Sequence, residues 1–243
     1  METITTASPQ MKARMAGLFY LLTFLVGVAF AVANGKLYVP GDPAATAANI
    51  LAHPHLLGLG FAADVIVVAC YIAVTALFYE LFAPVSSGIS RLAAFFSLVG
   101  CAIQGASCLF DLAPQVVLSG KSYLSVFKLE QLQALSLMPL GLHAQAFNIC
   151  FAVFGFYCVL IGYLAFRSTF LPRVIGVLMM FGGLCWLTFL FPPLASALSP
   201  YIRIPGIIGE GSLTLWLLVM GVNVQRWQAC RSDQWNTHTR AAL

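Results

Sequence analysis

The sequence predicts an all-α fold, a polytopic membrane helical bundle with six transmembrane helices. Of its 243 residues, 60% are hydrophobic and only 8% are charged, whereas soluble domains carry about 25% charged residues. The mean hydropathy is +0.92. Apolar segments long enough to cross a bilayer, which takes about 20 residues, alternate with short stretches rich in turn-forming residues. We therefore expect lipid to be the solvent for most of the surface.

Six segments are predicted to span the membrane, and the breaks between them carry turn chemistry. "NGKLYVPGDP" follows the first segment, "APVSSGIS" the second, "SGKSYLS" the third and "RSTFLPR" the fourth. Pro192–Pro193 ends the fifth segment, and "SPYIRIPG" leads into the sixth. The predicted spans are 15–33, 57–82, 92–118, 142–166, 174–191 and 204–226, with polar tails at 1–14 and 227–243.

The distribution of Lys and Arg predicts that both termini lie in the cytoplasm, because cytoplasmic loops carry an excess of these residues. With six spans, the inner side receives Lys12, Arg14, Arg91, Arg167, Arg173, Arg226, Arg231 and Arg240. The outer side receives Lys36, Lys121, Lys128 and Arg203. An alternative stays open for residues 1–33, whose basic start, apolar run and "AVA" ending resemble a cleavable signal peptide.

The odd-numbered spans open alike, which suggests three helical hairpin repeats. "RMAGLFYLLTFLVG", "RLAAFFSLVG" and "RVIGVLMMFGG" each place an Arg before small residues and an apolar run. The even-numbered spans align with Asp64, Asn148 and Glu210 in register. Three hairpins of one orientation are the arrangement that this alignment predicts.

Acidic side chains inside the apolar segments are the main functional signal. Asp64 lies seven residues, or about 10 Å, below the outer end of the second span, and Asp111 lies at a similar depth in the third. Glu210 and Asn148 lie six residues into the sixth and fourth spans. A charge in hydrocarbon costs roughly 2.5–3.5 kcal/mol on insertion scales, so such residues usually face a protein interior and find partners. We expect one shared cluster in the outer leaflet.

Further polar residues are expected to join this cluster. Cys101, Gln104, Cys108 and Asp111 share one face of a helix by their spacing. His143, at the outer end of the fourth span, is a candidate positive or neutral partner. The predicted ligand- or ion-binding residues are Asp64, Asp111, Glu210, Asn148, His143 and Gln104.

Three functions remain open at this point. The first is binding of a small cation, a proton or a lipid headgroup by the acidic cluster, and the second is a metal-dependent intramembrane hydrolase that acts on lipid. The third is a structural or accessory membrane subunit, in which the polar groups only bond one helix to another. Membrane lipids are the expected partners. No Lys/Arg cluster indicates nucleic acid, and seven cysteines without a C-x-x-C pair predict neither a disulfide framework nor a thiolate zinc site.

The chain also resembles a bacterial family of six-span membrane proteins that is catalogued only as a domain of unknown function. The resemblance is carried by "ARMAGLFYLLT", "VPGDPAATAANI", "AADVI", "LEQLQALSL", "FRSTFLPRVIGVL" and "GEGSLTLWLLVMGVN". It implies an integral protein of the bacterial inner membrane without an assigned reaction. The family's acidic positions correspond to Asp64 and Glu210, and its Leu-His pair corresponds to Leu142–His143. Tyr157 stands where His is often expected, and "CWLTFL" lacks an acidic residue, which argues against a metal site.

Overall fold

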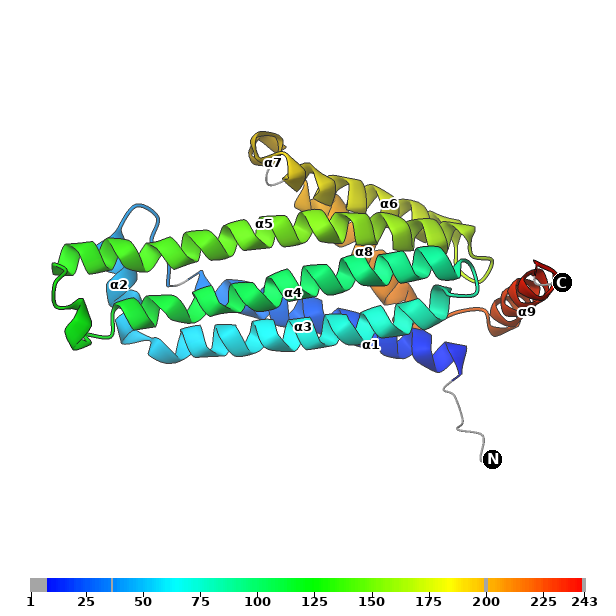
Figure 1. Cartoon of the computed structure of the whole chain (residues 1–243), viewed down its shortest axis with the longest axis horizontal. Coiled ribbons are helices and arrows are strands. Elements are labelled where there is room, and N and C mark those ends of the chain that lie inside the picture. The colour runs from blue at the N-terminus through cyan, green and yellow to red at the C-terminus, as the bar shows by residue number, and fades with distance from the viewer. Residues whose placement is uncertain (1–7, 36, 199–200, 242–243) are drawn as a thin grey trace, which may run out of the picture. The chain divides into compact units, whose positions relative to one another are not determined.

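A computed structural model describes residues 8–35, 37–198 and 201–241, and this described part contains helices and turns but no strand. The all-α prediction is therefore confirmed. The helices are α1 (Pro9–Asn34), α2 (Pro43–Ala52), α3 (Pro54–Phe82), α4 (Ser87–Val117), α5 (Leu129–Arg167), α6 (Arg173–Leu187), α7 (Pro192–Leu198), α8 (Arg203–Val219) and α9 (Val224–Ala241), with 3₁₀ turns η1 (Ser122–Leu124) and η2 (Thr188–Leu190) (Figure 1).

The described helices fit a multi-pass membrane protein. Five of them, α1, α3, α4, α5 and α6 extended through η2, are long and apolar enough to cross a bilayer. A sixth span results if α7 and α8, which bend by 85° relative to each other, are taken together. Of the cations used to predict orientation, Lys36 lies outside the described residues.

Three element boundaries differ from those predicted. The turn predicted at "PGDP" is present at 40–41, and the helix α2 that follows it at Pro43 was not predicted. The Asp42 side chain caps this helix, because it accepts a hydrogen bond from Ala45 N at 2.9 Å. Helix α5 begins at Leu129 and contains the whole of the span predicted at 142–166. Helix α8 ends at Val219 instead of 226, since Gly221 has a φ of +69° that interrupts the helix before α9.

The chain forms two compact units, and α1, α3, α4 and α5 each contribute to both. Unit 1 comprises Met1–Leu21, Cys70–Gly100 and Phe151–Leu243, and unit 2 comprises Leu22–Ala69 and Cys101–Cys150. The two units are described separately below.

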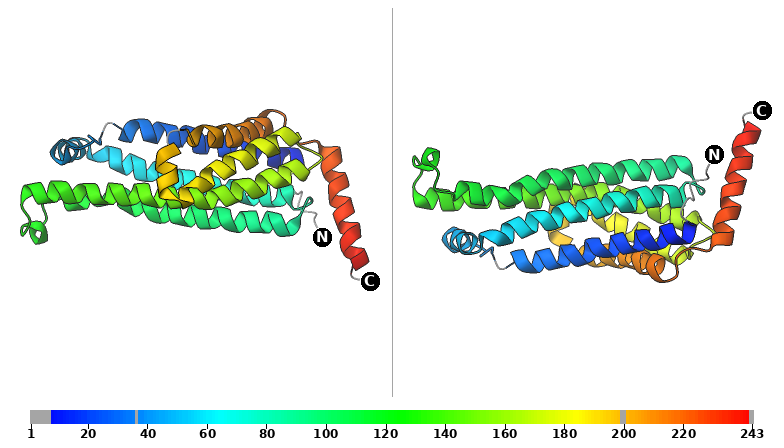
Figure 2. Two further views of the ribbon diagram at one scale, coloured as in Figure 1. Left: turned by 90° about the horizontal axis from the view of Figure 1, so that it is seen from above. Right: turned by 90° about the horizontal axis from the view of Figure 1, so that it is seen from below.

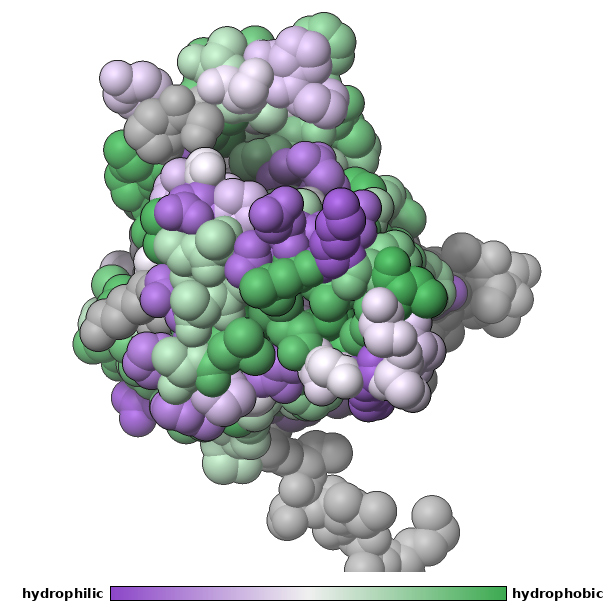
Figure 3. All heavy atoms as spheres, turned by 90° about the vertical axis from the view of Figure 1, so that its left-hand side faces the viewer, coloured by the Kyte–Doolittle hydropathy of each residue, from purple (hydrophilic) through white to green (hydrophobic). Residues whose placement is uncertain are grey.

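In unit 2, segments of α3, α4 and α5 run alongside one another (Figures 1 and 2). Leu37, Ile50 and Leu57 form a small buried core beside α2. On the face that carries α2 and η1, hydrophilic and hydrophobic residues lie side by side (Figure 3). Exposed Tyr123 and Val126 belong to this region. Such a mixed surface is typical of a membrane–water interface, where amphipathic side chains gather.

In unit 1, α6 and α8 approach each other closely because glycines face the contact. A Cβ atom built on Gly209 would lie 2.6 Å from the carbonyl oxygen of Leu178, and one on Gly182 would lie 3.0 Å from that of Pro205. Small residues of this kind allow membrane helices to pack backbone against backbone.

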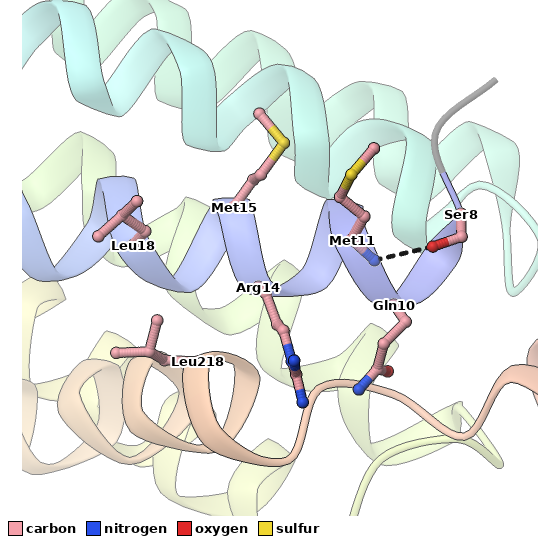
Figure 4. Close-up of a pocket in the computed structure, with 7 residues that line it drawn as sticks. All are labelled: Ser8, Gln10, Met11, Arg14, Met15, Leu18 and Leu218. Carbon is pink, nitrogen blue, oxygen red and sulfur yellow. Dashed lines mark hydrogen bonds between the residues drawn. The ribbon is translucent and has the colours of Figure 1, made fainter. Parts of the chain in front are cut away.

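Gln10 of α1 fixes the connection between α8 and α9. Its Nε2 donates to the carbonyl oxygen of Met220 at 3.0 Å, and its Oε1 accepts from Val222 N at 2.9 Å. Figure 4 shows Gln10 and Arg14 pointing from α1 toward the end of α8, beside Leu218. These side chains line an open groove of about 380 Å³. Gln10 thus satisfies backbone groups that the end of α8 leaves unpaired.

Candidate functional site

Unit 2 brings together Asp64 of α3, Asp111 of α4 and His143 of α5. One ligand atom from each of the three residues lies within 4.8 Å of the other two. Two ligands on opposite sides of one ion, each about 2.0–2.6 Å from it, are separated by about 4.0–5.2 Å. The three side chains are therefore close enough together to contact a single metal ion.

The imidazole of His143 is held by hydrogen bonds to α4. Its Nδ1 lies 3.1 Å from Asp111 Oδ1 and 3.3 Å from the carbonyl oxygen of Ser107. The ring also packs against Phe147, with centroids 5.1 Å apart. These contacts fix the position of the ring beside the two aspartates. When Nδ1 carries the proton and donates a hydrogen bond to α4, Nε2 keeps a lone pair that can bind a metal ion.

Both aspartates are buried and incompletely satisfied. Asp64 is 4% exposed and Asp111 is 5% exposed. Within the described part of the chain, the Oδ2 atom of each carboxyl has no hydrogen-bond partner. Leaving a buried polar atom unpaired costs about 1–3 kcal/mol, and more for a charged group. A proton shared by the two carboxyls, or a bound cation, would supply the partner that these two oxygens lack.

Helix α4 supplies the polar wall of the site. Cys101, Gln104, Cys108 and Asp111 are all buried, which confirms that the predicted stripe faces protein. The thiol of Cys108 donates to the Gln104 carbonyl oxygen at 3.3 Å, so the thiol has a partner of its own.

Glu210 makes a different set of contacts, in unit 1, and does not share the partners of the two aspartates. Its Oε2 accepts from the hydroxyls of Tyr20 at 2.6 Å and Tyr71 at 3.0 Å, and its Oε1 accepts from Trp186 Nε1 at 2.7 Å. Depth alone does not fix the partner of a side chain, because Tyr71 lies two helical turns beyond Asp64 along α3. The Glu210 carboxylate is instead satisfied by three donors from α1, α3 and α6.

The remaining predicted residue, Asn148, is half-buried on α5, and neither aspartate has it as a partner among the contacts of the described residues. Sequence reasoning missed Tyr20, Tyr71 and Trp186. A signal for them was present, because Tyr and Trp buried within apolar spans need a partner for their O–H or N–H group. The prediction assigned no such role to these aromatic residues.

A cavity of about 390 Å³ in unit 2 adjoins the site. Asp111 lines it, together with apolar residues that include Leu57, Leu140 and Ala144. Ala144 follows His143 directly in the sequence. Asp111 thus belongs both to the cluster with His143 and to the wall of this cavity.

A comparison with protein families finds one match that covers most of the chain. The family model described as Domain of unknown function (DUF4386) matches residues 15–221. No curated protein matches the chain. No solved structure matches it either.

Proposed function

The chain belongs to this family of unknown function, and we propose that Asp64, Asp111 and His143 form an intramembrane site for a divalent cation. The observation that carries the proposal is the pair of buried, unpartnered Oδ2 atoms on two neighbouring aspartates. A protonated histidine balances at most one carboxylate, whereas a divalent cation balances both and supplies the missing contacts.

The ligand chemistry narrows the choice of ion. Two carboxylates and one imidazole favour a metal that accepts both oxygen and nitrogen, such as Zn²⁺ or Mn²⁺. Ser107 and Phe147 are outer partners that orient the imidazole. Such outer contacts commonly contribute 10–100-fold to metal affinity.

Metal content tests the proposal. The purified protein, loaded with Zn²⁺ or Mn²⁺ and then dialysed, is expected to retain about one ion per chain by elemental analysis. Asp64→Asn, Asp111→Asn and His143→Ala should each weaken binding by more than about 100-fold, because loss of a direct ligand exceeds loss of an outer contact. Glu130→Gln and His55→Ala are matched controls, since both residues are exposed on unit 2.

Two results would count against a metal site. Binding that survives Asp111→Asn unchanged would place the ion elsewhere. A protein without bound metal, whose Asp64→Asn variant merely becomes less stable, would assign the cluster to helix-to-helix bonding in a structural subunit.

A metal-dependent hydrolase acting on lipid is the second candidate. Three protein ligands leave a coordination position free, as in catalytic zinc sites, where a bound water completes the shell. The test is release of fatty acid or headgroup from phospholipid in mixed micelles by Zn²⁺-loaded protein. Loss of that activity in His143→Ala, with no loss in His55→Ala, supports catalysis, and an inactive loaded protein supports binding alone.

The proposed orientation has both termini in the cytoplasm of a bacterial cell, with the cation site in the outer half of the membrane. It rests on the excess of Lys and Arg on the inner side. Arg14, at the first helix, and Arg226 and Arg231, on α9, belong to that excess.

A further inference from the structure

We propose that the open groove beside α1 and the end of α8 binds one anionic phospholipid of the membrane. Its phosphate lies at Arg14, and one acyl chain follows the groove toward Leu18 and Leu218. The groove belongs to unit 1, so this binding needs no ion in the cation site of unit 2. It adds a lipid site to the function proposed above.

The guanidinium group of Arg14 supplies a charge that an anion can meet. Arg14 is exposed, and its side chain forms neither an ion pair nor a hydrogen bond within the described part of the chain. Lys12 differs, because it pairs with Glu80. A guanidinium group presents a planar fork of N–H donors that matches phosphate oxygens. The unpaired charge beside an apolar groove therefore favours an anionic headgroup.

The rest of the groove offers a surface for a hydrocarbon chain. Met11, Met15 and Leu18 follow one another at intervals of four and three residues, so they share one face of α1. Their exposed fractions are 48%, 39% and 48%. Leu218 of α8 adds to this apolar lining. Methionine side chains are unbranched and flexible, so this wall can adapt to the shape of an acyl chain.

The direction of the groove agrees with the orientation of a lipid in a bilayer. Arg14 directly precedes the span predicted at 15–33, and Leu18 lies four residues, or about 6 Å, further along α1. The start of α1 meets the end of α8 here, because a Cβ atom built on Gly17 would lie 2.7 Å from Leu218 N. In Figure 4, Leu18 and Leu218 lie to one side of Arg14 along α1, and Gln10 lies to the other. The phosphate is thus near the membrane surface, and the chain points into the hydrocarbon.

Binding of two matched lipids tests this inference. Dioctanoylphosphatidylglycerol and dioctanoylglycerol carry the same two chains and differ in the phosphoglycerol group. Native mass spectrometry measures the binding of each lipid to the delipidated full-length protein. We expect Arg14→Gln to weaken binding of the phosphatidylglycerol by at least about tenfold, or ~1.4 kcal/mol, as expected for a lost hydrogen bond to a charged group. Binding of dioctanoylglycerol should not change.

Arg91→Gln is the matched control for the charge. Arg91 is also an exposed arginine near the start of a helix in unit 1, and it does not line the groove. This variant should change binding of the phosphatidylglycerol by less than about twofold, because salt screens a charge outside the groove.

Filling the groove provides the second arm. Leu18→Trp should weaken both lipids by at least about tenfold, the effect of about two CH₂ groups leaving the groove. Leu92→Trp is its control, because Leu92 of α4 in unit 1 is 47% exposed and lies outside the groove lining. Met15→Gln makes the wall polar without adding bulk and should act in the same direction. An unfolding temperature equal to that of the wild type shows that each variant is folded.

Three outcomes would overturn the inference. Equal losses in Arg14→Gln and Arg91→Gln would mean that the charge of the whole surface attracts the lipid. Competition by free glycerol 3-phosphate as strong as that by the lipid would mean that the groove holds no chain. Loss of a dimeric mass in Leu18→Trp would identify the groove as a contact between two copies of the chain. The cation site is tested separately, by metal content.

Discussion

Replacing Glu210 tests the second polar cluster, because this carboxylate accepts from Tyr20, Tyr71 and Trp186. In Glu210→Ala the two tyrosine hydroxyls, 3.0 Å apart, can still bond to each other. The N–H of Trp186 and the hydroxyl hydrogen of one of the two tyrosines would then have no acceptor. Two unsatisfied buried donors cost about 2–6 kcal/mol, and hydrogen bonds between membrane helices are usually weaker, at about 0.6–2 kcal/mol each. We expect a loss of about 3 kcal/mol.

The assay is thermal unfolding in detergent, followed by tryptophan fluorescence. Scans should use one fixed heating rate, because membrane proteins often unfold irreversibly. For a chain of this size about 3 kcal/mol corresponds to a decrease in Tm of ~6–12 °C. Glu210→Gln keeps one acceptor oxygen and should lose about 1 kcal/mol. Glu130→Gln, exposed on α5, should change nothing. A decrease below about 2 °C in Glu210→Ala would refute the reasoning, since it would mean that the three donors find other partners.

Two further predictions concern the end of α8 and the helix that follows it. Gly221 has a φ of +69°, and an added Cβ would lie 2.4 Å from the Gln10 side chain, so Gly221→Ala should lower stability by about 1–2 kcal/mol in the same unfolding assay. Gly211→Ala, with open space around its Cβ position, should leave the stability unchanged or raise it. Equal losses of stability in Gly221→Ala and Gly211→Ala would contradict the argument that the backbone of Gly221 is strained for other residues. Partial burial and the nearby Asp233 carboxylate raise the pKa of the Cys230 thiol. Labelling of Cys230 by a membrane-impermeant maleimide should therefore become fast only at pH values above the usual thiol pKa of about 8.5. In the proposed orientation the reagent reaches Cys230 only from the cytoplasmic side. Labelling in intact cells would indicate the opposite orientation.

The long apolar segments were predictable because lipid requires continuous apolar helices, and length and composition identify these directly. The short helix α2 was not predictable in this way, because it is not a long apolar segment. Its start depends on one capping bond from Asp42 to Ala45, which the same residues would also make in an isolated turn. The break at Gly221 was hidden for a similar reason, since glycine is common inside membrane helices.

Part of the candidate site was predictable from depth. Asp64, Asp111 and His143 lie near the outer ends of their spans, and the structure places their side chains within reach of one another. Depth did not predict the partners of Glu210, because depth says nothing about the direction in which a side chain leaves its helix. That direction depends on where the Tyr20 and Tyr71 hydroxyls lie, and on the packing of α6 against α8, which no count along the chain supplies.

Locating the ion itself tests the central claim most directly. Crystals of the protein grown with Zn²⁺ would give an anomalous difference map at the zinc edge. The account predicts one peak, about 2.0–2.2 Å from carboxylate oxygens of Asp64 and Asp111 and from a ring nitrogen of His143. A map at saturating Zn²⁺ without density between these three side chains, or with the two aspartates turned away from each other, would contradict it.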